Sequence, residues 1–361
     1  LSLIRAEIHQ DQANKIRDSL KIHSVDWRFV LMLADKHRVL PVLYANMKKL
    51  GLTELCPTFV RKQLSCRYLE IIAYNLRLRK RLTVILTLFE NRGIPAVPFK
   101  GPLLAQSLYG DSTLRYYQDL DILVAKESVS RCRVVLEESG FFLKEKDLSG
   151  NQYNQLLKYG RECDFTDASG YVMIDLHWQL GAPFRRPYDY EFCKDRLQLI
   201  RFNHREIVSL SPEDTLLHLC VNGTHDVWCN LEKILCVADF LERHPDLDWD
   251  LVRKLADRLH CRRMLFLGLF LARDVYDVAL PFKIVDQMEN DKKIEKIACN
   301  VYTILFQGIC SKSHIEKRLA EIPYYLGVRE HIYDFHSHPE RPEKSCHEFP
   351  VFKVAFFNAA H

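Results

Sequence analysis

The sequence lacks a long apolar run, a strong excess of one charge and closely spaced cysteine pairs. Its most apolar segment, 264–271, is far shorter than the roughly 20 residues of a membrane-spanning helix, so we expect no membrane partner. Lysine and arginine number 51 and aspartate and glutamate 47, and a net charge of only +4 disfavours nucleic acid as the main partner. The 12 cysteines include no C-x-x-C pair, and their spacing from histidines fits neither zinc fingers nor zinc ribbons.

The composition is that of a globular protein with reduced thiols. Hydrophobic residues make up 48% and charged residues 27% of the chain, which excludes a disordered protein. The length of 361 residues allows two or three packed units. No charged-then-apolar leader stands at the start, and several cysteines lie within apolar helical patterns. We therefore predict reduced cysteines and a cytoplasmic location.

The apolar periodicity changes along the chain and predicts an α+β protein. Residues 1–92 have helical spacing, residues 93–180 alternate short strand and helix patterns, and residues 181–330 are the predicted C-terminal helical domain, in which helical spacing returns from about residue 211. Residues 331–361 hold few helix signals and form a C-terminal extension. We predict a small mixed β-sheet embedded between N-terminal and C-terminal helical regions.

Two aspartates one residue apart interrupt an apolar strand pattern. Asp119 and Asp121 precede the run Ile122-Leu123-Val124, and strand alternation places both carboxylates on one side and Leu120 on the other. Two like charges in one small volume raise each other's pKa or require a cation. The pair therefore predicts a divalent metal site.

A second strand pattern, 171–178, supplies a third carboxylate. Here Asp175 and His177 face one way while Ile174 and Leu176 face the other. Three carboxylates on neighbouring strands suit phosphoryl or nucleotidyl transfer with two Mg²⁺ ions, which bind the attacking and the leaving oxygen.

The turn at Lys100-Gly101 is a candidate phosphate contact. It follows a short strand pattern, 96–99, and precedes Pro102, which suits the first turn of a helix. Backbone N–H groups and the Lys100 ammonium can meet phosphate oxygens at such a turn.

The motifs around these residues resemble those of a known family. Over roughly residues 30 to 280 the chain resembles the uncharacterised bacterial nucleotidyltransferases of the polymerase-beta-like nucleotidyltransferase superfamily. The resemblance rests on GIPAVPFKGPLLA (93–105), LYGD (108–111), Arg115, DLDILV (119–124) and IDLHW (174–178), preceded by HRVLPVLY (37–44) and followed by His225, Trp228, Leu231, Asp239 and Asp248-Trp249.

This resemblance implies an enzyme that transfers a nucleoside monophosphate from a nucleoside triphosphate, with ATP as one candidate, to an acceptor hydroxyl and releases pyrophosphate. It implies that Asp119 and Asp121 bind two Mg²⁺ ions and that Asp175 shares a metal and accepts a proton from the attacking hydroxyl. Lys100-Gly101 would replace the Gly-Ser that cradles phosphate in other superfamily members.

Two departures from the family pattern bear on the site. Tyr117-Gln118 precede Asp119 where small residues are common, and Asn222 stands where histidine is frequent. The first reshapes the expected nucleotide pocket, and the second puts a paired role for His225 in question.

Other residues near the site have two readings. Arg115 either contacts the triphosphate or pairs with acids of the core, and His177 either touches substrate or is a hydrogen-bonded spacer. His225 and Trp228 are expected to line an acceptor cleft between the sheet and the C-terminal helices.

Glu162 and Asp164 alternate in the same way as the favoured pair of aspartates. Because no resemblance supports them, we predict that they form a solvated face.

Two other functions stay open. The fold can serve as a catalytically silent nucleotide-binding or protein-interaction module, or as a phosphotransferase that moves the terminal phosphate. The acceptor is undetermined, with a small molecule or peptide favoured over nucleic acid because the charge is modest.

Overall fold

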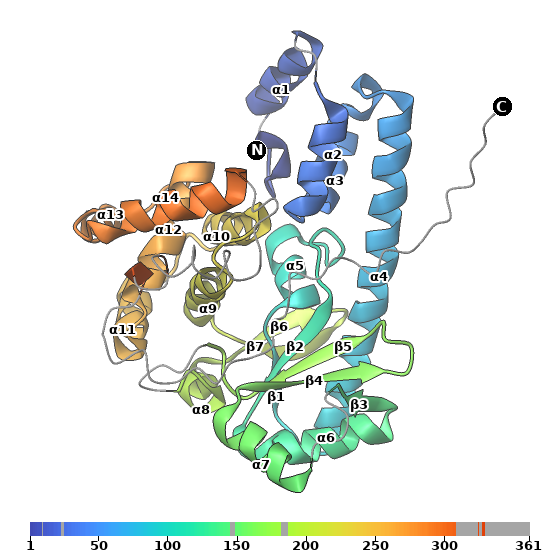
Figure 1. Cartoon of the computed structure of the whole chain (residues 1–361), viewed down its shortest axis with the longest axis vertical. Helices are drawn as coiled ribbons and strands as arrows, with labels where there is room; N and C mark the ends of the chain where they lie inside the picture. The colour runs from blue at the N-terminus through green and yellow to red at the C-terminus, as the bar shows by residue number, and fades with distance from the viewer. Residues whose placement is uncertain are drawn as a thin grey trace, which may run out of the picture.

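The computed structural model describes residues 1–8, 10–22, 25–144, 149–181, 187–307, 324, 327 and 328. Helices surround a small mixed sheet (Figure 1), which confirms the predicted α+β class. Four of the described α-helices precede the sheet: α1 Gln10–Ile22, α2 Trp27–Lys36, α3 Leu40–Lys49 and α4 Thr58–Asn91. The longest, α4, has 34 residues and runs from the N-terminal helices down to the sheet (Figure 1).

Five strands form the sheet in the order β1-β2-β5-β4-β3. They are β1 Ala96–Pro98, β2 Asp119–Val124, β3 Phe141–Leu143, β4 Glu162–Asp167 and β5 Met173–His177. Between them lie α5 Gly101–Tyr109, α6 Val129–Glu138 and α7 Gly150–Tyr159. The central pair β2 and β5 is parallel and the other three pairings are antiparallel, so the sheet is mixed as predicted.

The two faces of the sheet have different partners. Leu120 and Ile122 pack into one apolar cluster with α4 and α6 residues such as Leu82 and Leu136. The opposite face carries Leu123, which belongs to a second cluster with residues of α9, α10 and α12. Since Asp119 and Asp121 lie on the same side of β2 as Leu123, the acid-bearing face is turned toward the C-terminal helices.

The C-terminal helices begin at polar caps. Ser211, Asn230 and Asp248 each accept a hydrogen bond from a backbone N–H three residues later, which satisfies one unpaired donor of the first turn. The α-helices among the described residues of this part are α8 Tyr190–Cys193, α9 Pro212–His225, α10 Leu231–Arg243, α11 Trp249–Leu259, α12 Arg262–Tyr276, α13 Phe282–Glu289 and α14 Lys293–Gln307. Among the described helices, none combines the length and apolar character that crossing a membrane demands.

The region of the predicted C-terminal helical domain, 181–330, also contains a β-hairpin, which lies ahead of the helices predicted from about residue 211. Strands β6 Gln198–Phe202 and β7 Arg205–Ser209 form a hairpin there. Its two-residue turn, Asn203-His204, has positive φ at both positions (49° and 65°), a combination typical of tight hairpins. The Arg205 guanidinium donates to Thr87 Oγ1 of α4 at 2.7 Å and so anchors the hairpin to the long helix. The predicted C-terminal extension, 331–361, lies outside the described residues.

Candidate active site

Two of the predicted carboxylates come together because β2 and β5 are parallel neighbours. The register places Asp121 beside Asp175 and Asp119 beside Met173. Asp121 and Asp175 are only 6% and 5% exposed. One ligand atom each from Asp121, Asp175 and His177 lie within 4.8 Å of one another. The structure therefore concentrates acidic groups at one buried position on the sheet.

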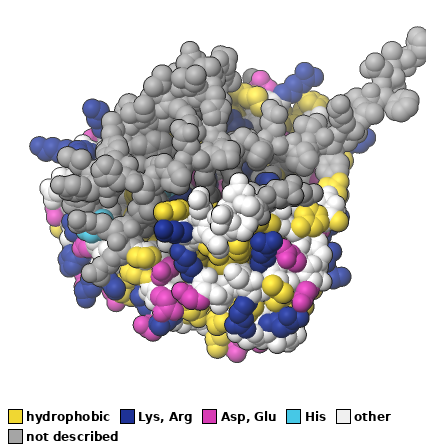
Figure 2. All heavy atoms as spheres, turned by 60° about the horizontal axis from the view of Figure 1, so that its bottom comes forward, with side chains coloured by type: hydrophobic (Ala, Val, Ile, Leu, Met, Phe, Trp, Pro, Cys, Tyr) yellow, Lys and Arg dark blue, Asp and Glu magenta, His cyan; other side chains and the backbone are white. Residues whose placement is uncertain are grey.

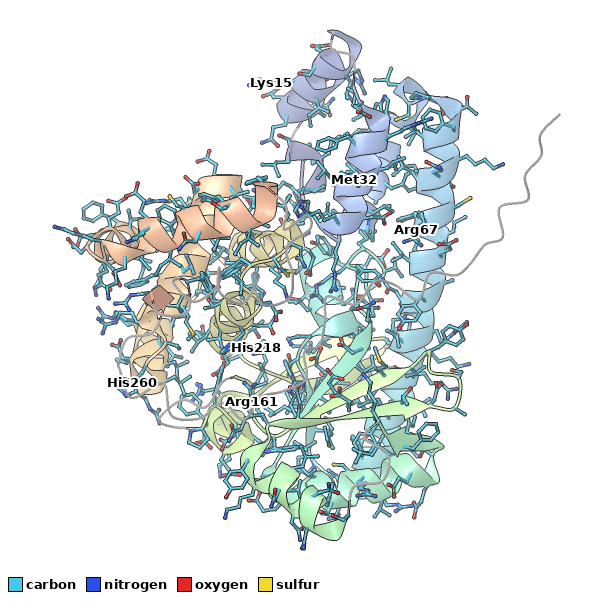
Figure 3. All side chains as sticks on the ribbon, in the orientation of Figure 1. Lys15, Met32, Arg67, Arg161, His218 and His260 are labelled. Atoms are coloured by element: carbon cyan, nitrogen blue, oxygen red, sulfur yellow. The ribbon has the colours of Figure 1, made fainter. Side chains whose placement is uncertain are left out.

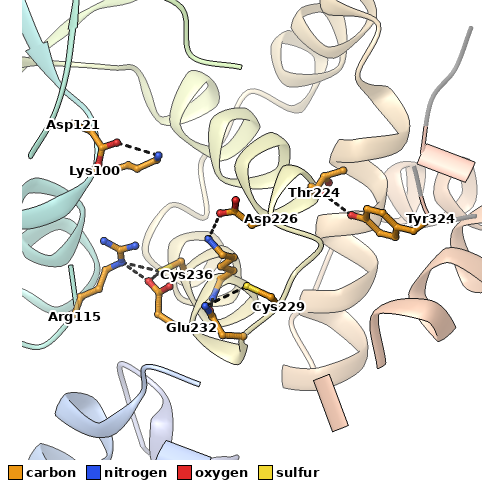
Figure 4. A network of polar contacts seen from close by, with 11 residues as sticks. Lys100, Arg115, Asp121, Thr224, Asp226, Cys229, Glu232, Cys236 and Tyr324 are labelled. Carbon is orange, nitrogen blue, oxygen red and sulfur yellow. Dashed lines mark hydrogen bonds and ion pairs between the residues drawn. The ribbon is translucent and has the colours of Figure 1, made fainter. Parts of the chain in front are cut away.

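Two basic side chains contact a single oxygen of Asp121. Lys100 Nζ and His177 Nε2 each lie 3.2 Å from Asp121 Oδ1, and the Lys100 contact is drawn in Figure 4. A buried carboxylate is tolerated only when its charge is compensated. Lys100, before α5, and His177, at the end of β5, provide that compensation.

The antiparallel register of β4 and β5 adds two acids to the site. Asp164 lies beside Asp175, and Glu162 lies beside His177. Glu162 Oε2 is 3.1 Å from His177 Nδ1, and Glu162, Asp164 and Asp175 form a second group of ligand atoms within 4.8 Å. The prediction of a solvated face is wrong because strand pairing, which local sequence does not encode, places Glu162 and Asp164 on the same face of the sheet as Asp175 and His177. In the sequence, the available sign of their position was that Glu162 and Asp164 alternate along a strand as the favoured pair of aspartates does.

His177 is held as a cation. Burial disfavours the charged imidazole, but the carboxylates of Glu162 and Asp121 outweigh burial and raise the pKa of His177 to about 9. At neutral pH both ring nitrogens therefore donate, Nδ1–H to Glu162 and Nε2–H to Asp121. The histidine bridges two acids, in line with the hydrogen-bonded spacer that the sequence left open.

The Lys100-Gly101 turn packs directly on β2. Lys100 is the N-cap of α5, and its side chain is 17% exposed. Gly101 has a φ of +53°, and a Cβ built there would lie 3.2 Å from the backbone oxygen of Asp119. Both the left-handed conformation and this close approach favour glycine.

Asp119 stands at the edge of the site. It begins β2, is half-buried, and belongs to neither group of three ligand atoms found among the described residues. The Tyr74 hydroxyl lies 2.9 Å from the carbonyl oxygen of Gln118 and 3.0 Å from that of Tyr171, and so ties α4 to the start of β2.

Of the two roles expected for Arg115, the structure shows the pairing with an acid of the core. Its Nε donates to Glu232 of α10 at 2.5 Å and lies 3.4 Å from Cys236 Sγ (Figure 4). The Arg115 and Glu232 side chains are 14% and 5% exposed. Burial opposes ionisation of Glu232, but Arg115 outweighs it and lowers the pKa of that carboxyl. Arg115 therefore links the sheet region to the C-terminal helices.

The prediction that Trp228 lines a cleft is wrong, because its side chain is completely buried. Val227 and Trp228 have positive φ values of 53° and 51°, and this turn folds the indole back onto α9. A Cβ at Gly223 would lie 2.5 Å from the Trp228 ring, so the ring fills the space that glycine leaves. His225, the last residue of α9, is half-buried.

Sequence reasoning assigned no role at this site to His218 of α9, which is labelled in Figure 3. Its ring packs edge-on against the Phe99 ring, with 4.9 Å between the ring centroids. The Phe99 ring in turn packs edge-on against His177, with 5.1 Å between the centroids. Burial lowers the pKa of His218 well below its ordinary value, so this histidine is neutral. These edge-on ring contacts connect α9 to the end of β5.

The donor set fits Mg²⁺. This ion takes oxygen ligands and few of them from protein, and Asp121 and Asp175 offer carboxylate oxygens on adjacent strands. Both ring nitrogens of His177 are already engaged, Nε2 with Asp121 and Nδ1 with Glu162. The carboxylates, and not the imidazole, are the groups that would hold the ion.

Several solved structures are similar to the chain. ANT(2'')-Ia in complex with adenylyl-2''-tobramycin is 14% identical with a TM-score of 0.36, over 51% of this chain and 97% of that one. The lincosamide antibiotic adenylyltransferase LnuA bound to lincomycin is 18% identical with a TM-score of 0.27, over 38% and 83%. An antigenic nucleotidyltransferase-like protein from Paracoccidioides brasiliensis is 16% identical with a TM-score of 0.31, over 55% and 96%. No curated protein matches the chain.

A family model described as uncharacterised nucleotidyltransferase matches residues 23–277. The match extends from the N-terminal helices through the whole sheet and past α12, which is more than half of the chain. The chain therefore belongs to this family of nucleotidyltransferase enzymes.

Proposed function

We propose that the protein transfers a nucleoside monophosphate from a nucleoside triphosphate to an acceptor hydroxyl, with Mg²⁺, and releases pyrophosphate. The observation that carries this proposal is the side-by-side burial of Asp121 and Asp175 on parallel strands of a nucleotidyltransferase. Bound Mg²⁺ would supply the positive charge that neutralises the triphosphate and the departing pyrophosphate.

Each acid has a proposed role. Asp121 and Asp175 would hold Mg²⁺, with Asp119 as a further ligand from the same face of β2. Asp175 lies between Asp121 and Asp164 in the sheet, where it would also accept the proton of the attacking hydroxyl.

Positive charge beside these acids would orient the phosphates. The Lys100 ammonium already lies 3.2 Å from Asp121, and Gly101 begins α5, whose N-terminus carries partial positive charge. Because phosphoryl chemistry asks little covalent participation of the protein, positioning and charge neutralisation would provide most of the rate.

A small molecule or peptide is the acceptor that the surface favours. On the face shown in Figure 2, basic and acidic side chains are interspersed over the described surface, whereas nucleic-acid binding uses a continuous basic one. His225, half-buried at the end of α9, is a proposed lining residue of the acceptor site. Because the proposed reaction consumes a nucleoside triphosphate, we propose the cytoplasm as the location of the protein.

The position of a radioactive label tests the reaction type. The protein is incubated with Mg²⁺ and each NTP, labelled on the α or the γ phosphate, together with separate small-molecule, peptide and RNA fractions of a cell extract. The proposal expects α label on a small molecule or peptide and γ label in pyrophosphate, with both lost on chelation of Mg²⁺. Transfer of γ label to an acceptor would favour the phosphotransferase, and NTP binding without pyrophosphate would favour the silent module.

A matched pair of variants assigns the activity to the site. Asp119→Asn is expected to abolish pyrophosphate release because it removes a proposed ligand charge. Asp195→Asn changes an exposed acid outside the site and is expected to keep wild-type turnover. Equal turnover by the two variants would remove Asp119 from the mechanism.

A further inference from the structure

We propose that Glu162 is a positioning residue that holds the metal-binding carboxylate of Asp121 in place through His177. The inference rests on the proposed function, because it assigns a role within the same site. Two contacts carry it: Glu162 Oε2 to His177 Nδ1 at 3.1 Å, and His177 Nε2 to Asp121 Oδ1 at 3.2 Å. Together they connect β4 to β2 across β5.

The three side chains are shielded from water. Their exposed fractions are 15% for Glu162, 8% for His177 and 5% for Asp121. A low local dielectric strengthens buried polar contacts relative to the same contacts in water. All three residues lie on strands of one sheet, and Phe99 packs edge-on against the His177 ring. The imidazole is therefore fixed by hydrogen bonds at both nitrogens and by packing at its side.

Fixing the imidazole fixes one oxygen of the carboxylate. His177 and Lys100 both contact Oδ1 of Asp121, so their positions determine the plane in which the second oxygen can reach a metal ion. Functional groups need placement within about 0.5 Å for full effect. Without the Glu162 carboxylate, the His177 ring loses its acceptor at Nδ1 and can rotate, and Asp121 loses a defined orientation.

Mn²⁺ binding, measured by electron paramagnetic resonance, tests this role without requiring turnover. Loss of an outer-shell partner typically weakens metal binding about 10–100-fold, and we expect that loss for Glu162→Ala. Glu162→Gln keeps an oxygen acceptor for Nδ1–H and is expected to stay close to wild type. Glu206→Ala removes an exposed glutamate from β7 and is the matched control, with unchanged affinity.

A double substitution tests whether Glu162 acts through the histidine. In a His177→Gln background, Glu162→Ala is expected to weaken Mn²⁺ binding no further. In turnover assays, Glu162→Ala should raise the Mg²⁺ concentration needed for half-maximal rate and leave the NTP KM unchanged at saturating Mg²⁺.

The outcomes separate the two proposals. Wild-type Mn²⁺ affinity in Glu162→Ala, or an equal loss in Glu162→Ala and Glu162→Gln, overturns the positioning role and leaves the proposed function standing. Absence of Mn²⁺ binding by the wild-type protein overturns both.

Discussion

Substituting Gly101 tests whether the turn before α5 is built to hold the site. A non-glycine residue at a positive φ lowers the free energy of unfolding by about 1–2 kcal/mol. The same residue restricts the unfolded chain, which raises that free energy by roughly 0.4–1 kcal/mol. Gly110, at the other end of α5, has a φ of +68°, and a Cβ built there would meet nothing within 4 Å, so Gly110→Ala should lower the free energy of unfolding by about 1 kcal/mol. It is the matched control.

Gly101→Ala bears a second cost. The new Cβ would lie 3.2 Å from the Asp119 oxygen, a strand carbonyl with little freedom to move, and such overpacking typically adds about 1–3 kcal/mol. We expect a total loss of roughly 2–4 kcal/mol in urea unfolding. We also expect lower pyrophosphate release, because Lys100 and Asp119 must shift. Equal stability and equal turnover in Gly101→Ala and Gly110→Ala would refute the reasoning.

Three further predictions concern residues outside the acid cluster. Burial, and to a smaller extent Lys36, lowers the pKa of His37 to about 4. The free energy of unfolding should therefore be highest above pH 6.5 and should fall by about 3 kcal/mol as the pH drops through 4. His37→Gln should remove this pH dependence in unfolding titrations. Arg115→Ala leaves the buried Glu232 carboxylate without its partner and should lower the free energy of unfolding in urea by about 3–5 kcal/mol. The double variant Arg115→Met with Glu232→Leu should recover much of that loss. A raised NTP KM in the double variant would instead support a contact between Arg115 and the triphosphate. Trp228→Ala should cost about 3–5 kcal/mol by calorimetry and leave the substrate KM of the folded fraction unchanged.

The parts of the site that local patterns encode were predictable from the sequence. Alternation alone placed Asp175 and His177 on one side of a strand, and the turn chemistry of Lys100-Gly101-Pro102 located the start of α5. Both are properties of a few consecutive residues, and the structure shows them in the predicted elements.

The remainder depends on contacts between distant segments. Glu162 and Asp164 join the site only because β4 pairs with β5 in a register that sets Asp164 beside Asp175. Trp228 is buried because a left-handed turn folds it onto Gly223, and Arg115 pairs with Glu232, which is more than a hundred residues away. The Asn203-His204 hairpin lies before the helices predicted from about residue 211, and its turn lacks the glycine that most often marks a two-residue hairpin.

The most direct test of the account is pyrophosphate release by Asp175→Asn, measured over a range of Mg²⁺ concentrations alongside its unfolding free energy. The amide keeps the shape of the side chain and removes a like charge beside Asp121 and Asp164, so the account predicts no turnover without a loss of stability. Asp195→Asn should match the wild-type protein in both measurements. Wild-type turnover in Asp175→Asn at any Mg²⁺ concentration would contradict the claim that this carboxylate serves the reaction.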